Sequence, residues 1–211
     1  MNIEHIKSKL LPVESVDNLD HLNANDELSL HQYFKAVGKD INIEFQPAGV
    51  LIPLVREPVS SSWNIILTKR AQHLKHHPGE ISFPGGRFEN VDSDLMKTAT
   101  RETHEEIGIL PENIEILGKL PMQKTISGYL VTPFVGEVKE NPILRIDKNE
   151  VDTAFEVPLE YALDAKNHKK VQRQVAGLTF SFYEIHYHQY RIWGATARMI
   201  VNLSRLLTIR D

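Results

Sequence analysis

Hydrophobic and polar residues recur in two different periods along the chain, which predicts both strands and helices. Short apolar runs, and runs in which apolar and polar residues alternate, predict strands. These runs lie at 48–55, 63–68, 114–120, 130–138, 154–157, 170–175 and 178–187. The first two should form one hairpin, and the last two should form another that turns at Ala176-Gly177. Pro53 has no amide hydrogen to donate, so we expect a bulge or a strand edge at that point.

Apolar residues spaced by three and four positions predict amphipathic helices. The predicted helices lie at about 3–11, 28–37, 93–107, 158–163 and 195–208. In the central one, Asp92 or Ser93 can cap the start, and Gly108 suits the left-handed residue that ends a helix. Strands mixed with a few helices indicate an α+β fold. We expect one domain over 1–211, with residues 1–46 as a helical extension packed on it.

Composition narrows the class of protein without identifying a reaction. The 211 residues are 41% hydrophobic and 25% charged, which is ordinary for a globular protein. A formal net charge of −4 argues against a general nucleic-acid binder, and the absence of cysteine excludes disulfides and zinc-thiolate sites. The first residues lack the apolar stretch of a signal peptide, and no apolar run is long enough to cross a bilayer. We therefore expect a cytoplasmic protein with no membrane or nucleic-acid partner. A homodimer is compatible with the sequence.

Three glutamates in the central helix form the first chemical motif. Glu102, Glu105 and Glu106 are spaced i, i+3 and i+4, so they fall on one helix face within an arc of roughly 100°. Their like charges destabilise the helix, and a bound divalent cation would offset this cost. Carboxylate oxygens are ligands that Mg²⁺ and Mn²⁺ prefer. Taken by itself, the helix is also consistent with a solvated acidic face.

A basic segment precedes this helix, and it ends in a tight Pro-Gly turn. Its cationic side chains are those of Lys69, Arg70, Lys75, His76 and His77. Positive groups beside an acidic cluster suit a metal-bound phosphate substrate, because the cations bind phosphate oxygens that the metal leaves free. A surface position without a ligand is the alternative for any single histidine.

The acidic helix resembles the second half of the Nudix box. The matching residues are Arg101-Glu102-Thr103-His104-Glu105-Glu106-Ile107-Gly108-Ile109, with Thr103 where an apolar residue is usual. The first half departs from the pattern. Arg101 lies fifteen residues after Gly86, one more than in the standard box, and the acidic loop 92–94 replaces the first glutamate, which has no assigned counterpart.

The basic segment resembles the signature of the coenzyme A pyrophosphatase branch of this family, which shares the longer box. The matching residues are Thr68, Arg70, Leu74, His77, Gly79 and Phe83-Pro84-Gly85-Gly86. Ala71 and Glu80 stand where serine and glutamine are usual. The branch also shares the ending Ile192-Trp193-Gly194-Ala195-Thr196-Ala197. The resemblance runs over residues 47–199, which is most of the chain.

The resemblance implies a Nudix-like α/β/α sandwich around a mixed sheet and a Mg²⁺- or Mn²⁺-dependent hydrolysis. Coenzyme A or acyl-coenzyme A would be cleaved to 3′,5′-ADP and 4′-phosphopantetheine or its acyl derivative. Glu102 and Glu106 would hold the metal, together with a main-chain carbonyl near Gly85 or Gly86. Glu105 would be a further ligand or the base that deprotonates water. Arg101 would belong to the catalytic group by fixing the glutamates through ion pairs.

Substrate binding is expected from the basic segment, through Arg70, His77 and Lys69. Arg70 is a candidate for reading the 3′-phosphate of coenzyme A. Some Nudix enzymes place an extra acid where Glu150 and Asp152 lie, but a solvated loop is the favoured interpretation of both. The alternatives are a Nudix enzyme for another nucleoside diphosphate derivative, such as ADP-ribose or an NAD-type dinucleotide, and a non-catalytic binding module.

Overall fold

The computed structural model describes residues 2–15, 24–38, 44–139 and 142–208, without the side chains of 24–29. The strands are β1 (Gln46–Arg56), β2 (Trp63–Arg70), β3 (Ile81–Ser82), β4 (Gly85–Arg87), β5 (Ile114–Lys119), β6 (Gln123–Lys124), β7 (Tyr129–Val138), β8 (Val151–Pro158), β9 (Lys169–Val175), β10 (Leu178–Tyr187) and β11 (Tyr190–Trp193). The helices are α1 (Ile3–Lys9), α2 (Ala24–Ala36), α3 (Leu95–Ile107), α4 (Leu159–Leu163) and α5 (Gly194–Thr208), with short 3₁₀ turns at Pro111–Asn113 and Ala165–Asn167. The predicted α+β class is confirmed.

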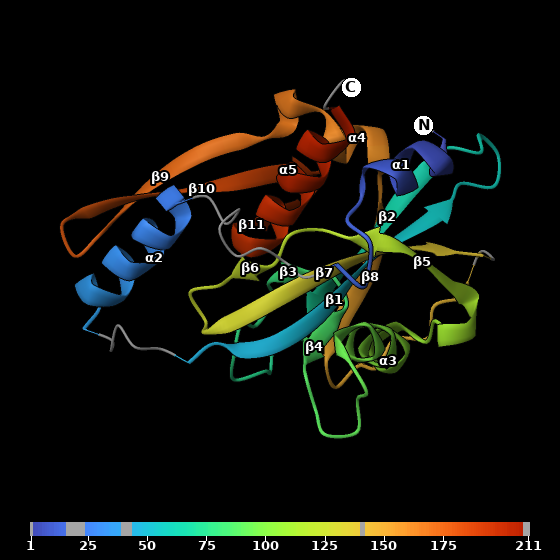
Figure 1. Ribbon diagram of the computed structural model, residues 1–211, viewed down its shortest axis with the longest axis horizontal. Coiled ribbons are helices and arrows are strands. Elements are labelled where there is room, and N and C mark those ends of the chain that lie inside the picture. The colour runs from blue at the N-terminus through green and yellow to red at the C-terminus, as the bar shows by residue number, and fades with distance from the viewer. Residues whose placement is uncertain (1, 16–23, 39–43, 140–141, 209–211) are drawn as a thin grey trace.

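The main sheet is mixed and has helices on both faces. Its strand order is β3-β2-β1-β7-β5, and β4, β6 and β8 pair with β1, β7 and β2. Strand β1 runs parallel to β7 and antiparallel to β2 and β4. Helix α3 lies against one face, and α1, α4 and α5 lie on the other (Figure 1). This arrangement is the helix–sheet–helix sandwich expected from the sequence.

Pro53 lies in the central strand β1, at a gap in one of its two ladders. On that side β4 pairs with residues 48–50 and β2 pairs with residues 54–56. The other side pairs with β7 over residues 46–54. The interruption expected at this proline is therefore present, but the expected strand edge is wrong, because β1 has neighbours on both sides. Two short partners share one side of β1, and the proline falls between them.

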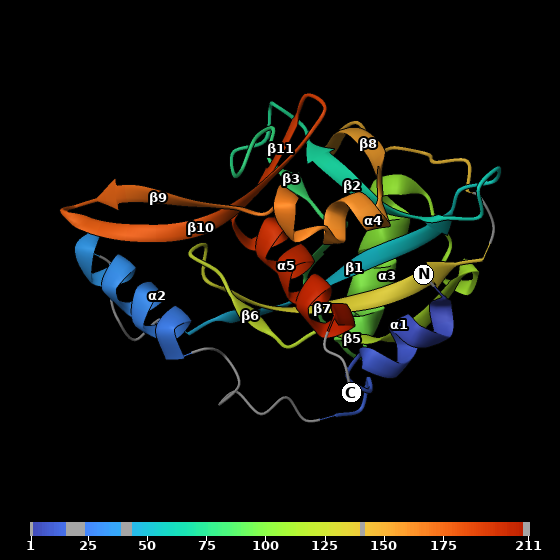
Figure 2. The same cartoon turned by 90° about the horizontal axis from the view of Figure 1, so that it is seen from above.

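A second, three-stranded sheet has the order β11-β10-β9. The hairpin expected here is confirmed, and its turn residues Ala176 and Gly177 have φ values of 48° and 81°, as tight hairpin turns require. Seen from above, the β9–β10 hairpin projects beyond the main sheet, with α2 beside it (Figure 2). The Tyr33 and Phe180 rings meet edge to face at 5.4 Å. The sequence predicted the hairpin but not its separation from the main sheet.

The N-terminal extension packs on the remainder of the chain where the structure describes it. Ile6 on α1 is fully buried in the main hydrophobic core, and Leu11 pairs with Lys119 of β5. Residues 1, 16–23 and 39–43 of this extension, and the side chain of Leu28, lie outside the described residues. Among the helices in the described ranges, none is both long and apolar enough to cross a membrane.

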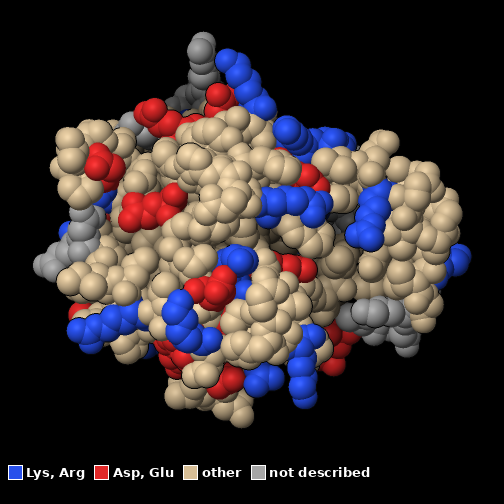
Figure 3. All heavy atoms as spheres, turned by 180° about the vertical axis from the view of Figure 1, so that it is seen from behind, with Lys and Arg blue, Asp and Glu red and all other residues tan. Residues whose placement is uncertain are grey.

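Positive and negative side chains are interspersed over the face opposite the view of Figure 1. Figure 3 shows lysine and arginine beside aspartate and glutamate across this surface, without one broad patch of a single sign. The mixed pattern agrees with the small net charge of −4. Any charge-based recognition therefore depends on local groups of side chains.

Candidate metal centre

Helix α3 is fixed at both ends by local hydrogen bonds. At the start, Asp94 is the cap, since its Oδ1 accepts from the Lys97 amide at 2.8 Å. The caps expected from the sequence, Asp92 and Ser93, are wrong, because the Asp92 side chain turns inward to Arg101. At the end, Gly108 has a φ of 77° and its amide donates to the His104 carbonyl.

A cluster of three carboxylates forms where α3 meets the residue that precedes β8. One carboxylate oxygen from each of Glu102, Glu106 and Glu150 lies within 4.8 Å of the other two. Glu106 is only 2% exposed, and its Oε2 has no hydrogen-bond partner among the described residues. Burial raises the pKa of Glu106 to about 8, and the nearby Glu102 and Glu150 also raise it, while Arg70 opposes the shift.

Gly86 leaves room for this cluster. A Cβ atom at Gly86 would lie 2.5 Å from both Cδ and Oε1 of Glu102, so a side chain at this position would collide with the carboxylate. The neighbouring Gly85 contributes a backbone hydrogen bond to Glu106. The glycines therefore allow the backbone to approach the two glutamates of α3 closely, as expected for the metal-ligand region.

The three carboxylates fit a hard divalent cation. A buried oxygen without a hydrogen bond is costly, and a ligated cation would satisfy it. A cation would also offset the repulsion among three acids that share one small volume. Oxygen donors of this kind suit Mg²⁺ and Mn²⁺, whereas the chain has no thiolate to bind softer metals.

Arg101 lies at the centre of an ion-pair network beside the cluster. It donates to Asp92 from Nε at 2.8 Å and from Nη2 at 3.0 Å, and it donates to Glu105 from Nη1 at 2.8 Å. Its Nη2 also lies 3.0 Å from Glu102. These are the ion pairs to glutamate that the sequence predicted, and they connect one carboxylate of the cluster to a fixed guanidinium.

Asp92 and Asp94 lie in the acidic loop whose part in the site the sequence left open, and Asp92 is the one that reaches Arg101. Its side chain is buried and accepts from Arg101, from the Thr98 hydroxyl at 2.9 Å and from the Glu89 amide at 3.1 Å. The Arg101 guanidinium and these hydrogen bonds hold the pKa of Asp92 well below its usual range, although burial opposes them. Asp92 therefore orients Arg101 from the loop that lengthens the box.

Glu105, which the sequence placed among the metal ligands, lies outside the carboxylate cluster, whereas the loop residue Glu150 belongs to it. The Glu105 side chain is 52% exposed, pairs with Arg101 and lies outside the Glu102–Glu106–Glu150 cluster, so its role as ligand or base stays a prediction. Glu150 is exposed, as expected for a loop acid, but the structure corrects its interpretation as a merely solvated residue. The pairing of Arg70 with Val151 brings the start of β8, and thus Glu150, beside the cluster.

The three predicted substrate-binding residues lie in different environments. Arg70 lies close enough to Glu106 to oppose its pKa shift, and its buried Nε has no hydrogen-bond partner in the described part of the chain. Lys69 pairs with Asp152 at 3.0 Å, and His77 pairs with Glu80 at 2.8 Å, which raises the pKa of His77. Arg70 alone of the three therefore combines nearness to the cluster with an unused buried donor.

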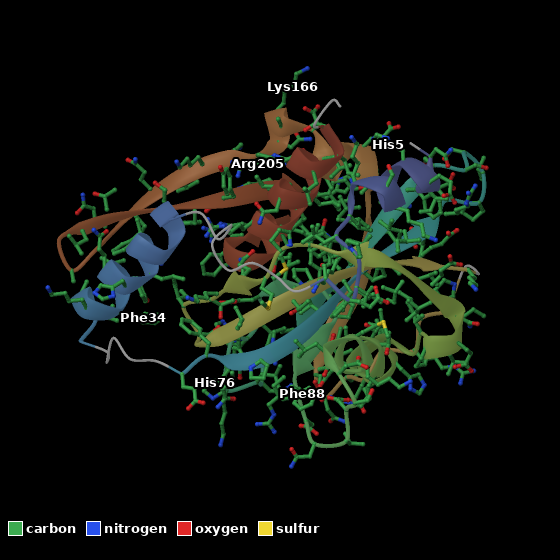
Figure 4. All side chains as sticks on the ribbon, in the orientation of Figure 1. His5, Phe34, His76, Phe88, Lys166 and Arg205 are labelled. Carbon is green, nitrogen blue, oxygen red and sulfur yellow. The ribbon has the colours of Figure 1, made fainter. Side chains whose placement is uncertain are left out.

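The basic segment and the lengthened box loop extend from the same side of the sheet. In Figure 4, His76 and Phe88 both lie along the lower edge of the molecule, on the side where α3 lies.

The third motif that resembles the coenzyme A branch, at 192–197, forms the junction of β11 and α5. Its Thr196 hydroxyl donates to the Ile81 carbonyl at 3.0 Å, so this motif contacts the strand that follows the basic segment.

Solved structures with some likeness to this chain include two of different origin. One is a binary complex of a C. elegans Ap4A hydrolase, with a TM-score of 0.46 and 18% identity over 54% of this chain and 80% of that chain. The other is the NUDIX domain of Shewanella oneidensis NrtR complexed with ADP ribose, with a TM-score of 0.44 and 17% identity over 57% of this chain and 77% of that chain.

Sequence relatives cover almost the full chain. The uncharacterized Nudix hydrolase NudL of Enterobacter sp. (strain 638) is 36% identical over 184 residues, which are 87% of this chain and 94% of that protein. The NudL protein of Escherichia coli (strain SMS-3-5 / SECEC) is 33% identical over 189 residues, or 90% and 97% of the two chains. The model of the NUDIX domain matches residues 46–176, around the carboxylate cluster. Motif, site and relatives agree, and the chain belongs to the Nudix hydrolase family.

Proposed function

We propose that this protein is a metal-dependent hydrolase that cleaves the diphosphate of coenzyme A or acyl-coenzyme A. The observation that carries the reaction class is the carboxylate cluster with the buried, unpaired Arg70 Nε beside it. The choice of coenzyme A rests on the signature from Thr68 to Gly86, where the residues match the coenzyme A branch. The products would be 3′,5′-ADP and 4′-phosphopantetheine or its acyl derivative.

Glu102, Glu106 and Glu150 would hold Mg²⁺ or Mn²⁺, with a main-chain carbonyl near Gly86 as a further ligand. The bound ion supplies a water of lowered pKa and positive charge against the diphosphate. Arg70 donates hydrogen bonds to a diphosphate oxygen from the position it occupies beside Glu106. Arg101 acts through the glutamates, which it holds by ion pairs, and does not contact the substrate.

The reaction balances as a simple hydrolysis. The water oxygen forms a bond to one phosphorus, the bridging P–O bond breaks, and each product leaves as a phosphate monoester. A carboxylate must accept the water proton, and Glu105 and Glu150 are exposed carboxylates close to Glu102 and Glu106. Glu105 is the base that we propose, since its hydrogen bond from Arg101 fixes it in position beside the cluster.

One observation favours a second substrate class. Lys69 and His77 are both paired with acids, so two of the three residues expected to bind coenzyme A have partners already. Arg70 lies where it can bind a diphosphate, which ADP-ribose and NAD-type dinucleotides share. A Nudix hydrolase for one of these compounds is therefore the second candidate.

A substrate panel tests the proposal directly. Coenzyme A, acyl-coenzyme A, ADP-ribose, NADH and nucleoside triphosphates are incubated with the protein and Mg²⁺ or Mn²⁺, and the products are identified by mass. We expect 3′,5′-ADP from coenzyme A derivatives, and loss of the activity in excess EDTA. Turnover that persists in EDTA would contradict the metal mechanism. Faster turnover of ADP-ribose would overturn the substrate assignment and keep the hydrolase class.

Replacing Arg70 tests whether this residue binds the diphosphate of the substrate or the 3′-phosphate of coenzyme A. Arg70→Ala is expected to lower kcat/KM by about 10- to 100-fold, the loss of a hydrogen bond to a charged group worth about 1.5–3 kcal/mol. Because Arg70 is placed to bind the diphosphate, the fold-loss should be equal for coenzyme A and dephospho-coenzyme A. A larger loss on coenzyme A would instead support the reading of the 3′-phosphate, and Arg70→Lys serves as the charge-preserving control.

Three further expectations from the sequence stay proposals. They are the single domain over 1–211, the cytoplasmic location and a homodimeric state. Sedimentation of the purified chain would decide between the monomer and the homodimer.

A further inference from the structure

Residues 144–150 lead into β8 and bring Glu150 to the carboxylate cluster. Glu150 is exposed and belongs to neither a helix nor a strand. The backbone of this segment must therefore hold the Glu150 side chain close to Glu102 and Glu106. The hydrogen bonds of the segment show how it is held.

One side of the segment is bonded to the end of α3. The Asp147 amide donates to the Glu106 carbonyl at 3.0 Å, and the Arg145 amide donates to the Ile107 carbonyl at 2.9 Å. Carbonyls in the last turn of a helix have no partner within the helix, so the segment satisfies two of them. Gly108 permits this contact, because a Cβ there would lie 2.8 Å from the Arg145 Cβ.

Asp147 closes a tight turn just before Glu150. Its carbonyl accepts from the amides of Glu150 at 3.1 Å and Val151 at 2.9 Å. Its side-chain Oδ1 accepts from the Asn149 amide at 2.9 Å and from the Asn149 Nδ2 at 2.9 Å. A side chain that accepts from the backbone two residues onward fixes the turn that follows it.

The other side of the segment is bonded to the start of the loop after β2. The Ala71 amide donates to the Glu150 carbonyl at 2.8 Å, and the His73 ring nitrogen Nε2 lies 3.0 Å from the Asn149 carbonyl. The backbone of Glu150 is thus held from both sides. In this arrangement the Asp147 side chain supplies the hydrogen bonds that determine the direction of the turn.

We propose that Asp147 is a positioning residue that keeps Glu150 in the metal-binding cluster. This inference rests on the proposed metal-dependent function. Asp147 acts through the turn and does not contact the metal. Partners of this indirect kind typically change metal affinity by about 10- to 100-fold when they are removed.

Direct measurement of Mn²⁺ binding to the full-length, metal-free protein tests this role without any substrate. Free Mn²⁺ is followed by electron paramagnetic resonance during titration. Asp147→Ala is expected to raise the Kd for Mn²⁺ by about tenfold. Asp147→Asn should stay near the wild-type value, since its amide oxygen can still accept from Asn149. Asp147→Ser should fall between the two, because a hydroxyl forms the same turn more weakly.

Two further variants separate positioning from general stability. Asp164→Ala removes a comparable turn, in which the Asp164 Oδ1 accepts from the Lys166 amide at 3.0 Å, and it should leave Mn²⁺ binding unchanged. Asp147→Ala combined with Glu150→Gln should bind Mn²⁺ no more weakly than Glu150→Gln alone, because Asp147 acts through Glu150.

The outcomes distinguish this inference from the proposed function. A wild-type protein that does not bind Mn²⁺ would overturn both. A wild-type protein that binds Mn²⁺, together with unchanged binding in Asp147→Ala and Asp147→Ser, would overturn the positioning role alone. Additive losses in the double variant would assign Asp147 a purely structural role, and they would contradict the inference too.

Discussion

Replacing Glu106 with glutamine is expected to lower kcat by at least about 100-fold. Mutation of a residue that only supports a metal ligand lowers activity by about 10- to 100-fold, and loss of a ligand itself should have at least the larger effect. Glu106 is the most buried carboxylate of the cluster, and its Oε2 has no hydrogen-bond partner among the described residues. Glutamine keeps the shape and removes the charge. The amide carries no charge to bury, so the metal-free variant should melt at or above the wild-type temperature.

The measurement compares steady-state kinetics, Mn²⁺ binding and the melting temperature of the same preparations. Glu115→Gln is the matched control, because Glu115 is an exposed glutamate on β5 that does not belong to the carboxylate cluster. Its ion-pair partners are Lys7 at 3.8 Å and Lys139 at 3.6 Å. The control should retain full activity. Wild-type turnover in Glu106→Gln would remove Glu106 from the metal site, and a large fall in its melting temperature would attribute the loss of activity to unfolding.

The fold was predictable wherever a local pattern decides the structure. Apolar runs located β1 and β2, and the Ala176-Gly177 pair located the turn of the β9–β10 hairpin. The strands β3, β4 and β6, of two or three residues each, are too short to show a period. The division into two sheets was also hidden, because it depends on which strands pair across long stretches of chain.

The same distinction applies to the site. Glu102 and Glu106 were identifiable because helix geometry fixes their mutual position. Glu150 was not, since it reaches them only through the pairing of β8 with β2 and the bonds of its segment to α3. The role of Asp92 was hidden for a related reason: the loop must fold back on α3 before its carboxylate meets Arg101. Residues that act across chain separations of this kind need the tertiary structure.

Replacing Asp92 with alanine is expected to destabilise the protein by about 3–5 kcal/mol, because it removes one partner of a largely buried ion pair. Asp92 receives two hydrogen bonds from Arg101, one from Thr98 and one from the Glu89 amide. For a chain of this size the melting temperature should fall by about 10 °C. Asp94→Ala is the matched control. It removes the helix cap, which contributes about 1 kcal/mol, and one exposed hydrogen bond from Ser93.

The pH dependence of this loss identifies its origin. The pKa of Asp92 in the folded protein lies below its ordinary value of about 3.9, so its stabilisation is complete above that value and is lost as the pH falls below it. Urea unfolding should therefore give a constant difference between wild type and Asp92→Ala from pH 7 to about 5, and a shrinking difference below about 4. A difference that persists undiminished into acid would assign the loss to packing.

In a double-mutant cycle, Asp92→Ala and Arg101→Ala should couple strongly, since each residue loses its main partner when the other is removed. Because Arg101 also contacts Glu102, Asp92→Ala should lower Mn²⁺ affinity in the fraction that remains folded.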